Sequence, residues 1–269
     1  MTKKFGIIGW PLGHTMSPTL HTWGFGELGI NAIYEAWPLE PHDVSTFMER
    51  VRTEPVSGAS VTIPHKRSVM EHLDRMTDRA KAVGAVNTLY WDGDKLCGEN
   101  TDVTGLVAPL KKLESLPDSA IVLGAGGAAR AAIAGLQELG IDEITVSNRT
   151  LEKAEALATD FSVRCVAWDN RMDESPGLIL NTTPLGMSGD MEDLTPWDAD
   201  RFPTKAVAYD IVYNPLKTRF LREAKTAGCV TISGLEMFLH QGLAQFKLWT
   251  GRDMDESGAR KLLLTTLSS

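Results

Sequence analysis

Residues 120–140 read AIVLGAGGAARAAIAGLQELG: an apolar strand, a glycine-rich turn and an alanine-rich helix in direct succession. Gly124, Gly126 and Ala129 fit the spacing G-x-G-x-x-[G/A] at the junction of strand and helix. Bare backbone lets a pyrophosphate approach such a turn, and the N-terminus of the helix stabilises its charge. A tight turn packed closely on a sheet is the alternative explanation. We favour a dinucleotide-binding α/β domain.

The next predicted strand, EITVSN at 143–148, runs into Arg149 without an acidic residue at its end. Enzymes that use NAD usually place Asp or Glu near this point for the ribose 2′-hydroxyl, whereas an arginine accommodates the 2′-phosphate of NADP. The planar fork of Arg149 suits a phosphate, and Asn148, Thr150 and Lys153 add donors around it. The alternative is a solvated Arg149 with Thr150 as helix N-cap, which leaves a cation at the helix N-terminus unexplained. We predict NADP as the cofactor.

The whole chain has the composition of a globular protein, with 269 residues that are 43% hydrophobic and 23% charged. This length allows two domains with sizeable cores. A net charge of -8 and the lack of any Lys/Arg-rich run argue against nucleic acid or an anionic membrane as partner. The opening apolar run is too short for a signal peptide, and none reaches membrane-spanning length. Cys97, Cys165 and Cys229 show no paired spacing, so we expect reduced thiols in a cytoplasmic protein.

Strand-like and helical segments alternate along the first half of the chain, which predicts βα units and a parallel sheet. The pattern restarts after Asp102 with an amphipathic helix and a polar linker at 114–119, and helical spacing returns at 235–251 and 256–267. We therefore expect an α/β protein of two domains with a cleft between them. The first comprises 1–102 with the returning helices 235–269, and the second comprises 103–234.

The first half also places polar side chains near the ends of its strand candidates. Thr15 and Ser17 follow the first strand, at the edge where open α/β sheets bind ligands. Ser17 before a proline is equally typical of a helix N-cap. Asn87 and Asp102 each belong to an Asn-Thr motif at a further strand candidate. Hydroxyls, amides, one lysine and one aspartate indicate a pocket for a polyhydroxylated small molecule rather than a metal site.

That lysine is Lys66, in the segment GASVTIPHKRS. Pro64 lacks an N–H and ends the strand, so we expect Lys66 to begin the next helix at the carboxyl edge of the sheet. The helix dipole disfavours a cation there, a mild cost that makes sense if Lys66 has a function at that edge. A surface lysine in a salt bridge is the alternative. Three histidines without paired spacing are expected to be structural: His14, His21 and His65.

Nine motifs in chain order give the sequence a resemblance to the shikimate dehydrogenase family over essentially its whole length. They are GHTMSPTLH, GASVTIPHK, GAVNTL, GENTD, GAGGAAR, NRTLEKA, NTTPLGM, YDIVYNPLKT and FLHQGLAQFKLWTG. The resemblance implies an N-terminal substrate-binding domain and a C-terminal Rossmann-like NADP-binding domain. It also implies reversible reduction of 3-dehydroshikimate to shikimate with NADPH, on the route to chorismate and the aromatic amino acids.

The resemblance further implies roles for individual residues. Lys66 and Asp102 work together as the proton-transfer pair. The implied substrate-binding positions are Thr15, Ser17, Ser60, Thr62, Asn87, Tyr213 and Gln241. The implied cofactor-binding positions are Gly124, Ala125, Gly126, Gly127, Ala128, Asn148, Arg149, Thr150, Lys153, Ile211 and Gly234. No metal is expected.

Three positions depart from the family's usual residues, which are serine at Thr15, asparagine at Ser60 and glycine at Val103. Thr15 adds a methyl group, and Ser60 shortens a side chain that ordinarily reaches a ring hydroxyl. A quinate, quinate/shikimate or aminoshikimate dehydrogenase is therefore an alternative. A non-catalytic paralogue that binds NADP or ligand is another, although a binder has no need of the Lys66–Asp102 pair. The expected partner is a small-molecule substrate, and a homodimer stays open.

Overall fold

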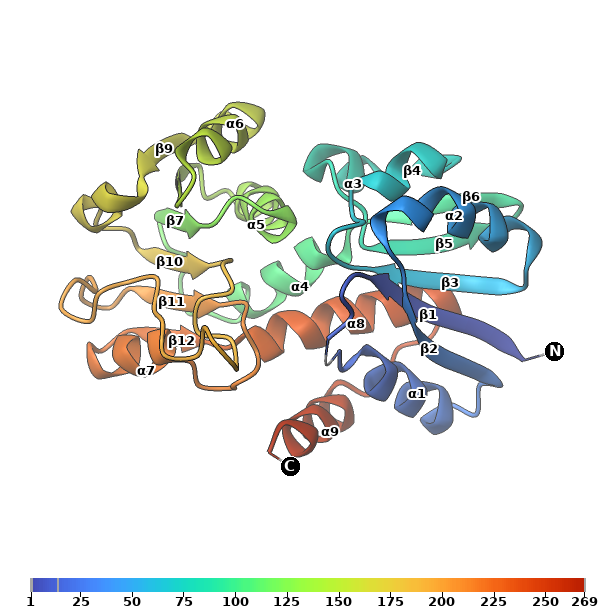
Figure 1. Ribbon diagram of the computed structural model, residues 1–269. Coiled ribbons are helices and arrows are strands. Elements are labelled where there is room, and N and C mark those ends of the chain that lie inside the picture. Colours follow the sequence, from blue (N-terminus) through green and yellow to red (C-terminus); the bar gives the residue numbers. More distant parts are fainter. Residues whose placement is uncertain (1, 14, 269) are drawn as a thin grey trace. The chain divides into compact units, whose positions relative to one another are not determined.

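The computed structural model describes residues 2–13 and 15–268, so the prediction for His14 lies outside the described residues. The chain forms two compact units, Met1–Thr101 with Gln241–Ser269, and Asp102–His240. The second division falls inside α8 (Gly234–Thr250), which is one uninterrupted helix (Figure 1). The sequence placed its domain boundaries after residues 102 and 234.

The first unit is built on a mixed sheet in the order β2-β1-β3-β5-β6-β4. Its strands are β1 (Lys3–Gly9), β2 (Ala32–Pro38), β3 (Val56–Val61), β4 (Arg75–Met76), β5 (Thr88–Asp92) and β6 (Lys95–Glu99). The predicted parallel arrangement holds for β1 with β2 and β3, but β5 runs antiparallel to both β3 and β6. For β5 and β6 the reason is the short connection from Asp92 to Lys95, which can join only antiparallel strands.

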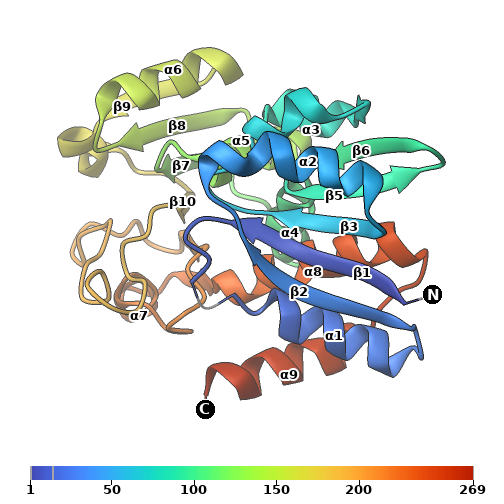
Figure 2. The same cartoon turned by 45° about the vertical axis from the view of Figure 1, so that its right-hand side comes forward.

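Helices cover both faces of this sheet, as Figure 2 shows for α1 and α2. The helices of the first unit are α1 (Ser17–Glu27), α2 (Val44–Thr53), α3 (Asp78–Val83) and α9 (Glu256–Leu267), together with the later part of α8. On one face, Phe47 and Met48 of α2 pack on Ile8 and Val61 of the sheet. The other face carries an aromatic cluster, in which Phe5 of β1 contacts Phe25 of α1 and Trp249 of α8.

The second unit contains a parallel sheet in the order β12-β11-β10-β7-β8-β9. Its strands are β7 (Ser119–Leu123), β8 (Glu143–Asn148), β9 (Arg164–Ala167), β10 (Leu178–Asn181), β11 (Val207–Asp210) and β12 (Val230–Ile232). Its helices are α4 (Thr101–Leu110), α5 (Gly127–Glu138), α6 (Leu151–Phe161), α7 (Arg219–Thr226) and the start of α8. Numbered within the unit, the strand order is 3-2-1-4-5-6, the doubly wound arrangement of dinucleotide-binding domains.

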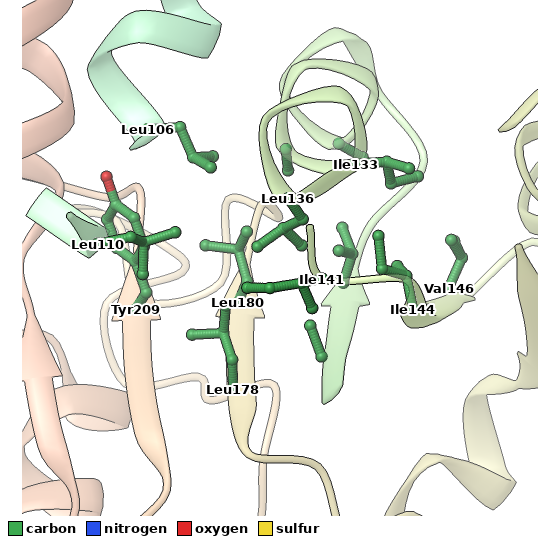
Figure 3. Close-up of a cluster of buried hydrophobic side chains, with 14 of the residues drawn as sticks. Leu106, Leu110, Ile133, Leu136, Ile141, Ile144, Val146, Leu178, Leu180 and Tyr209 are labelled. Carbon is green, nitrogen blue, oxygen red and sulfur yellow. The ribbon is translucent and has the colours of Figure 1, made fainter. Parts of the chain in front are cut away.

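The core of the second unit forms where α4 and α5 meet the strands (Figure 3). Ile133 and Leu136 of α5 are directed onto the sheet, where Leu178 and Leu180 of β10 lie. These side chains are fully buried, and each buried leucine or isoleucine contributes roughly 1.5–3 kcal/mol of hydrophobic stabilisation. The packing fixes the start of α5 at the carboxyl end of β7, next to the switch point between β7 and β10.

Candidate active site

Lys66 lies in a turn between β3 and a short 3₁₀ helix, Ser68–His72, and not at the start of an α-helix as predicted. The strand ends at Val61, and a backbone bond from His65 N to Thr62 O closes the turn at 2.9 Å. The peptide of Val86 donates to the Lys66 carbonyl at 2.7 Å. The helix-dipole argument for Lys66 therefore does not apply. The half-buried side chain instead projects from a turn tied to the segment before β5.

The β5–β6 hairpin brings two of the predicted motifs together. Asn87 immediately precedes β5, and Thr101 follows β6 as the first residue of α4. The Asn87 side chain accepts from the Thr101 backbone N–H at 2.7 Å and donates to the Thr101 hydroxyl at 3.0 Å. Since Val61 N also bonds Asn87 O at 2.7 Å, Asn87 connects the end of β3 to the start of α4. Asp102, the next residue, is buried in the first turn of that helix.

Thr15 and Ser17 lie together at the start of α1. The Thr15 hydroxyl donates to the Ser17 hydroxyl at 3.3 Å and accepts from the Ser17 backbone N–H at 3.3 Å. Ser17 is already inside the helix, and the N-cap position falls on Met16, which makes no side-chain cap bond. The predicted capping role of Ser17 is therefore wrong. The Ser17 side chain is buried. Burial raises the pKa of Tyr34, and the side chains of Ser60 and Ser17 oppose this shift.

A buried polar network behind these residues contains side chains that sequence reasoning missed. Tyr34 Oη donates to Ser60 Oγ at 2.7 Å, and Ser60 Oγ donates to Gln245 Oε1 at 2.8 Å. Gln245 Nε2 donates in turn to Thr88 Oγ1 at 3.0 Å and to the Asn87 carbonyl at 3.2 Å. The predicted substrate position Ser60 is thus part of this network. The one sequence signal was the helical spacing that sets Gln245 one turn after Gln241 on α8.

The two described histidines that were expected to be structural are both buried. His65 Nε2 donates to the Leu39 carbonyl at 2.6 Å, which anchors the Lys66 turn. His21 stacks on Tyr34 with ring centroids 4.6 Å apart. Neither His21 ring nitrogen has a hydrogen-bond partner within residues 2–13 and 15–268. Burial lowers the pKa of His21 to about 3, and the Gln245 side chain opposes this shift.

In the second unit, the glycine-rich turn joins β7 to α5 as the sequence predicts. Gly124 has φ +117°, and a Cβ there would lie 2.5 Å from Thr182 Oγ1, so the position requires glycine. Gly126 is the exposed N-cap of α5 and has no side-chain hydrogen bond to the helix. The first backbone N–H groups of α5 therefore open onto the turn from Gly124 to Ala128. This geometry fits a pyrophosphate at a helix N-terminus.

The end of β8 presents the predicted phosphate-binding group. Asn148 closes the strand and donates from Nδ2 to the Thr150 carbonyl at 2.9 Å. Thr150 is the N-cap of α6, but its hydroxyl makes no capping bond, so capping does not explain this residue. Arg149, Thr150 and Lys153 are exposed. No acidic side chain ends the strand, and the group fits the 2′-phosphate of NADP.

The loop after β11 is held by a buried carboxylate that sequence reasoning also missed. Asp210 accepts from Thr218 Oγ1 at 2.6 Å, Asn181 Nδ2 at 2.9 Å and Val212 N at 3.0 Å. Burial raises the pKa of Asp210 to about 7, although these three hydrogen bonds oppose the shift. The YD of the motif YDIVYNPLKT was the available signal, since a charged residue directly after apolar strand residues needs buried partners.

Two predicted backbone positions meet beside this carboxylate. Gly234 begins α8 with its backbone so close to the Ile211 carbonyl that any Cβ would overlap it. Tyr213 lies further along the same loop and packs on Phe238 of α8, with ring centroids 5.0 Å apart. Gln241 is half-buried on α8 in the first unit.

Within the described ranges, no group of three or more His, Cys, Asp or Glu side chains is arranged to hold a metal ion. The three cysteines are free thiols. None of the helices that the structure describes is both long enough and apolar enough to cross a membrane.

Comparison with known proteins identifies three family models along the chain. Residues 7–89 match the shikimate dehydrogenase substrate binding domain, residues 108–174 match shikimate / quinate 5-dehydrogenase, and residues 234–264 match the shikimate 5′-dehydrogenase C-terminal domain. A shikimate dehydrogenase (NADP(+)) of Maridesulfovibrio salexigens is 56% identical, over 98% of this chain and 97% of its own.

Solved structures show the same fold. Shikimate 5-dehydrogenase from Thermus thermophilus, crystallised with NADP(H) and shikimate, matches with a TM-score of 0.89 and 37% identity over 98% of this chain and 99% of its own. Quinate dehydrogenase from Corynebacterium glutamicum, in complex with NAD, matches with a TM-score of 0.91 and 28% identity, over 98% of this chain and 99% of its own. Because the family models and the 56% identical relative span both α/β units, this chain belongs to the shikimate dehydrogenase family.

Proposed function

We propose that this protein is an NADP-dependent enzyme that interconverts shikimate and 3-dehydroshikimate, in the biosynthesis of chorismate and aromatic amino acids. The observation that carries the proposal is the convergence of the Lys66 turn, Asn87 and the first turn of α4 at one edge of the first unit's sheet. The Lys66 turn and the Asn87 amide lie at that edge, and Asp102 directly follows Thr101, which Asn87 holds. A relative that is 56% identical, named for this activity and for NADP, supports the same conclusion.

Proton transfer at the substrate oxygen is the role we assign to Lys66. Its ammonium donates a proton as the ketone of 3-dehydroshikimate is reduced, and its neutral amine takes the proton back when shikimate is oxidised. Asp102 balances the charge of Lys66 and accepts a hydrogen bond from a substrate hydroxyl. Oxidation should therefore speed up toward alkaline pH, because it needs the neutral amine.

Polar side chains, most of them on the first unit, are the proposed substrate contacts. Thr15 and Ser17 offer hydroxyls from the start of α1, and Asn87 offers an amide fixed by Thr101. The other proposed contacts are Ser60, Thr62, Tyr213 and Gln241. Neutral hydroxyls and amides suit a polyhydroxylated ring, because each buried hydroxyl needs a partner.

The second unit fits NADP by its own geometry. The turn from Gly124 to Ala128 leaves the N-terminus of α5 open to a pyrophosphate, and Arg149, with Asn148, Thr150 and Lys153, takes the 2′-phosphate. The backbone of Ile211 and Gly234 would complete the cofactor site. When bound, the cofactor supplies the hydride for reduction and accepts it in oxidation.

The substrate alternative is quinate, which has one more ring hydroxyl. Thr15 and Ser60 differ from the residues usual in the family, and the fold is shared with a quinate dehydrogenase at 28% identity. Two finer predictions belong here as well: a homodimer as the assembly, and the cytoplasm as the location.

Initial rates with shikimate and quinate, each with NADP and NAD, test the proposal through the absorbance of the reduced nicotinamide. The expected result is the highest kcat/KM with shikimate and NADP, with NADP favoured over NAD by about tenfold or more. A higher kcat/KM with quinate would overturn the substrate assignment. The absence of turnover with either substrate would overturn the catalytic assignment and favour a binding paralogue.

A further inference from the structure

Gln245 is a buried amide on α8 whose three hydrogen bonds all go to residues around the substrate edge. We propose that Gln245 is a positioning residue for the reaction: it fixes Asn87, and through Asn87 the start of α4, and it fixes the direction in which Ser60 can bond a substrate hydroxyl. This inference rests on the proposed function. Gln245 itself is not assigned a contact with substrate or cofactor.

The orientation of the network is set by two backbone groups whose chemistry is unambiguous. The Thr101 backbone N–H can only donate, so the Asn87 atom that it meets at 2.7 Å is the oxygen Oδ1. Thr88 then donates its hydroxyl proton to this Oδ1 at 2.8 Å, which leaves Thr88 Oγ1 as an acceptor. The Asn87 carbonyl is likewise an acceptor only. The Gln245 atom facing both acceptors must be the donor Nε2.

The direction of the Ser60 hydroxyl proton follows from the other end of the Gln245 amide. With Nε2 directed at Asn87 and Thr88, the oxygen Oε1 of Gln245 faces Ser60 and accepts its proton at 2.8 Å. Ser60 in turn accepts the proton of Tyr34 at 2.7 Å. The single hydroxyl proton of Ser60 is thus committed, and only an acceptor lone pair is left. Toward a substrate, Ser60 can pair with a hydroxyl donor and disfavours a carbonyl or carboxylate oxygen.

The position of Gln245 makes these bonds consequential for catalysis. Asn87 holds the backbone N–H and the hydroxyl of Thr101, and Thr101 directly precedes Asp102. A shift of the Asn87 side chain would therefore move the first turn of α4. Small displacements of positioned groups cost large factors in rate, about 100-fold for 1 Å. A buried glutamine is also costly unless all its polar atoms are paired, and here each of them is.

The first test replaces the amide by a side chain of similar shape without hydrogen bonds, Gln245→Met. The expected result is a fall of about 10- to 100-fold in kcat/KM for shikimate, with the KM for NADP changed less than about twofold. Gln137→Met is the matched control, because that exposed glutamine on α5 also donates to a backbone carbonyl, of Phe161 at 3.0 Å. If Gln245→Met does not fold, Thr88→Val removes the hydroxyl between Gln245 and Asn87, and the same fall in kcat/KM for shikimate is expected.

The second test uses Gln245→Glu and a pH profile, which a merely structural role would not move. The introduced carboxylate cannot donate to Thr88 or to the Asn87 carbonyl, but the protonated carboxyl can. Burial disfavours the charged carboxylate, so a larger fraction of the introduced side chain is protonated as the pH falls. The titratable side chains beside this position are His21 and Tyr34, and burial keeps both neutral across the range used. The kcat/KM for reduction of 3-dehydroshikimate, divided by that of wild type, should rise about fivefold or more from pH 8 to pH 5.5.

The outcomes separate this inference from the proposed function. A wild-type protein that turns over shikimate, with Gln245→Met and Thr88→Val no different from Gln137→Met, overturns the inference alone. Equal losses in kcat/KM for shikimate and for NADP also overturn it. So does a kcat/KM of Gln245→Glu, relative to wild type, that does not change with pH. A wild-type protein without shikimate turnover overturns the proposed function, and the positioning role with it.

Discussion

Replacing His21 by phenylalanine should remove a large part of the protein's sensitivity to acid. The imidazole is fully buried against Tyr34, Phe246 and Trp249. Since neither ring nitrogen has a hydrogen-bond partner in the described chain, an aromatic ring without nitrogens loses no bond there. The charged imidazolium is excluded from this site, and burial holds the pKa of His21 at about 3.

The magnitude follows from the difference between the folded and unfolded pKa values. The ordinary histidine pKa is 6.5, so the unfolded chain binds a proton at this position between pH 6.5 and about pH 3, while the folded chain does not. The stability that neutral His21 contributes is therefore present above pH 6.5 and lost as the pH falls toward 3. From pH 7.5 to pH 5 this loss amounts to about 2 kcal/mol.

Urea unfolding of wild type and His21→Phe at pH 7.5 and pH 5 measures this difference directly. The free energy of unfolding of His21→Phe, relative to wild type, should increase by about 2 kcal/mol at the lower pH. His42→Phe, at a histidine side chain that is 74% exposed, is the control and should show no such change. A His21→Phe difference that stays constant between the two pH values would refute the buried neutral histidine.

Three other perturbations test separate parts of the account. Arg149→Ala should cost about 1.5–3 kcal/mol in transition-state binding with NADP and far less with NAD; equal losses in kcat/KM for both cofactors would contradict the phosphate contact. Asp210→Asn should become more stable relative to wild type by about 2 kcal/mol between pH 5 and pH 7. The raised pKa of Asp210 means that wild type loses stability as this carboxyl ionises, and the asparagine does not ionise. Urea unfolding in which this difference does not change with pH would argue against it. Gly124→Ala should destabilise by about 1–3 kcal/mol at its positive φ, whereas Gly126→Ala, with open space for a Cβ, should cost little; similar melting temperatures would show that the turn relaxes.

The sequence predicted well those features that depend on local pattern. The strand, turn and helix at 120–140 became β7, the glycine turn and α5, because apolar periodicity and a glycine at positive φ are local properties. The last helix, predicted at 256–267, has those bounds in α9. The lack of an acid after β8 was likewise readable from the residues alone.

Features that depend on distant pairing were missed. The antiparallel β5 was read as part of a parallel pattern, since nothing in its composition specifies its direction in the sheet. Lys66 was placed at a helix start, but the peptide of Val86 captures its carbonyl and holds it in a turn. The bond from Ser60 to Gln245 joins residues 185 positions apart, and no periodicity in the sequence reports such a pair.

Steady-state kinetics of Lys66→Ala decide whether Lys66 transfers the proton. We expect a fall in kcat for shikimate oxidation of about 10²- to 10⁴-fold, with KM changed far less and with the fold and NADP binding preserved. Lys95→Ala, at another lysine of the first unit, is the control and should keep the wild-type kcat. A Lys66→Ala protein with kcat within a few-fold of wild type would contradict the account and leave the proton donor unassigned.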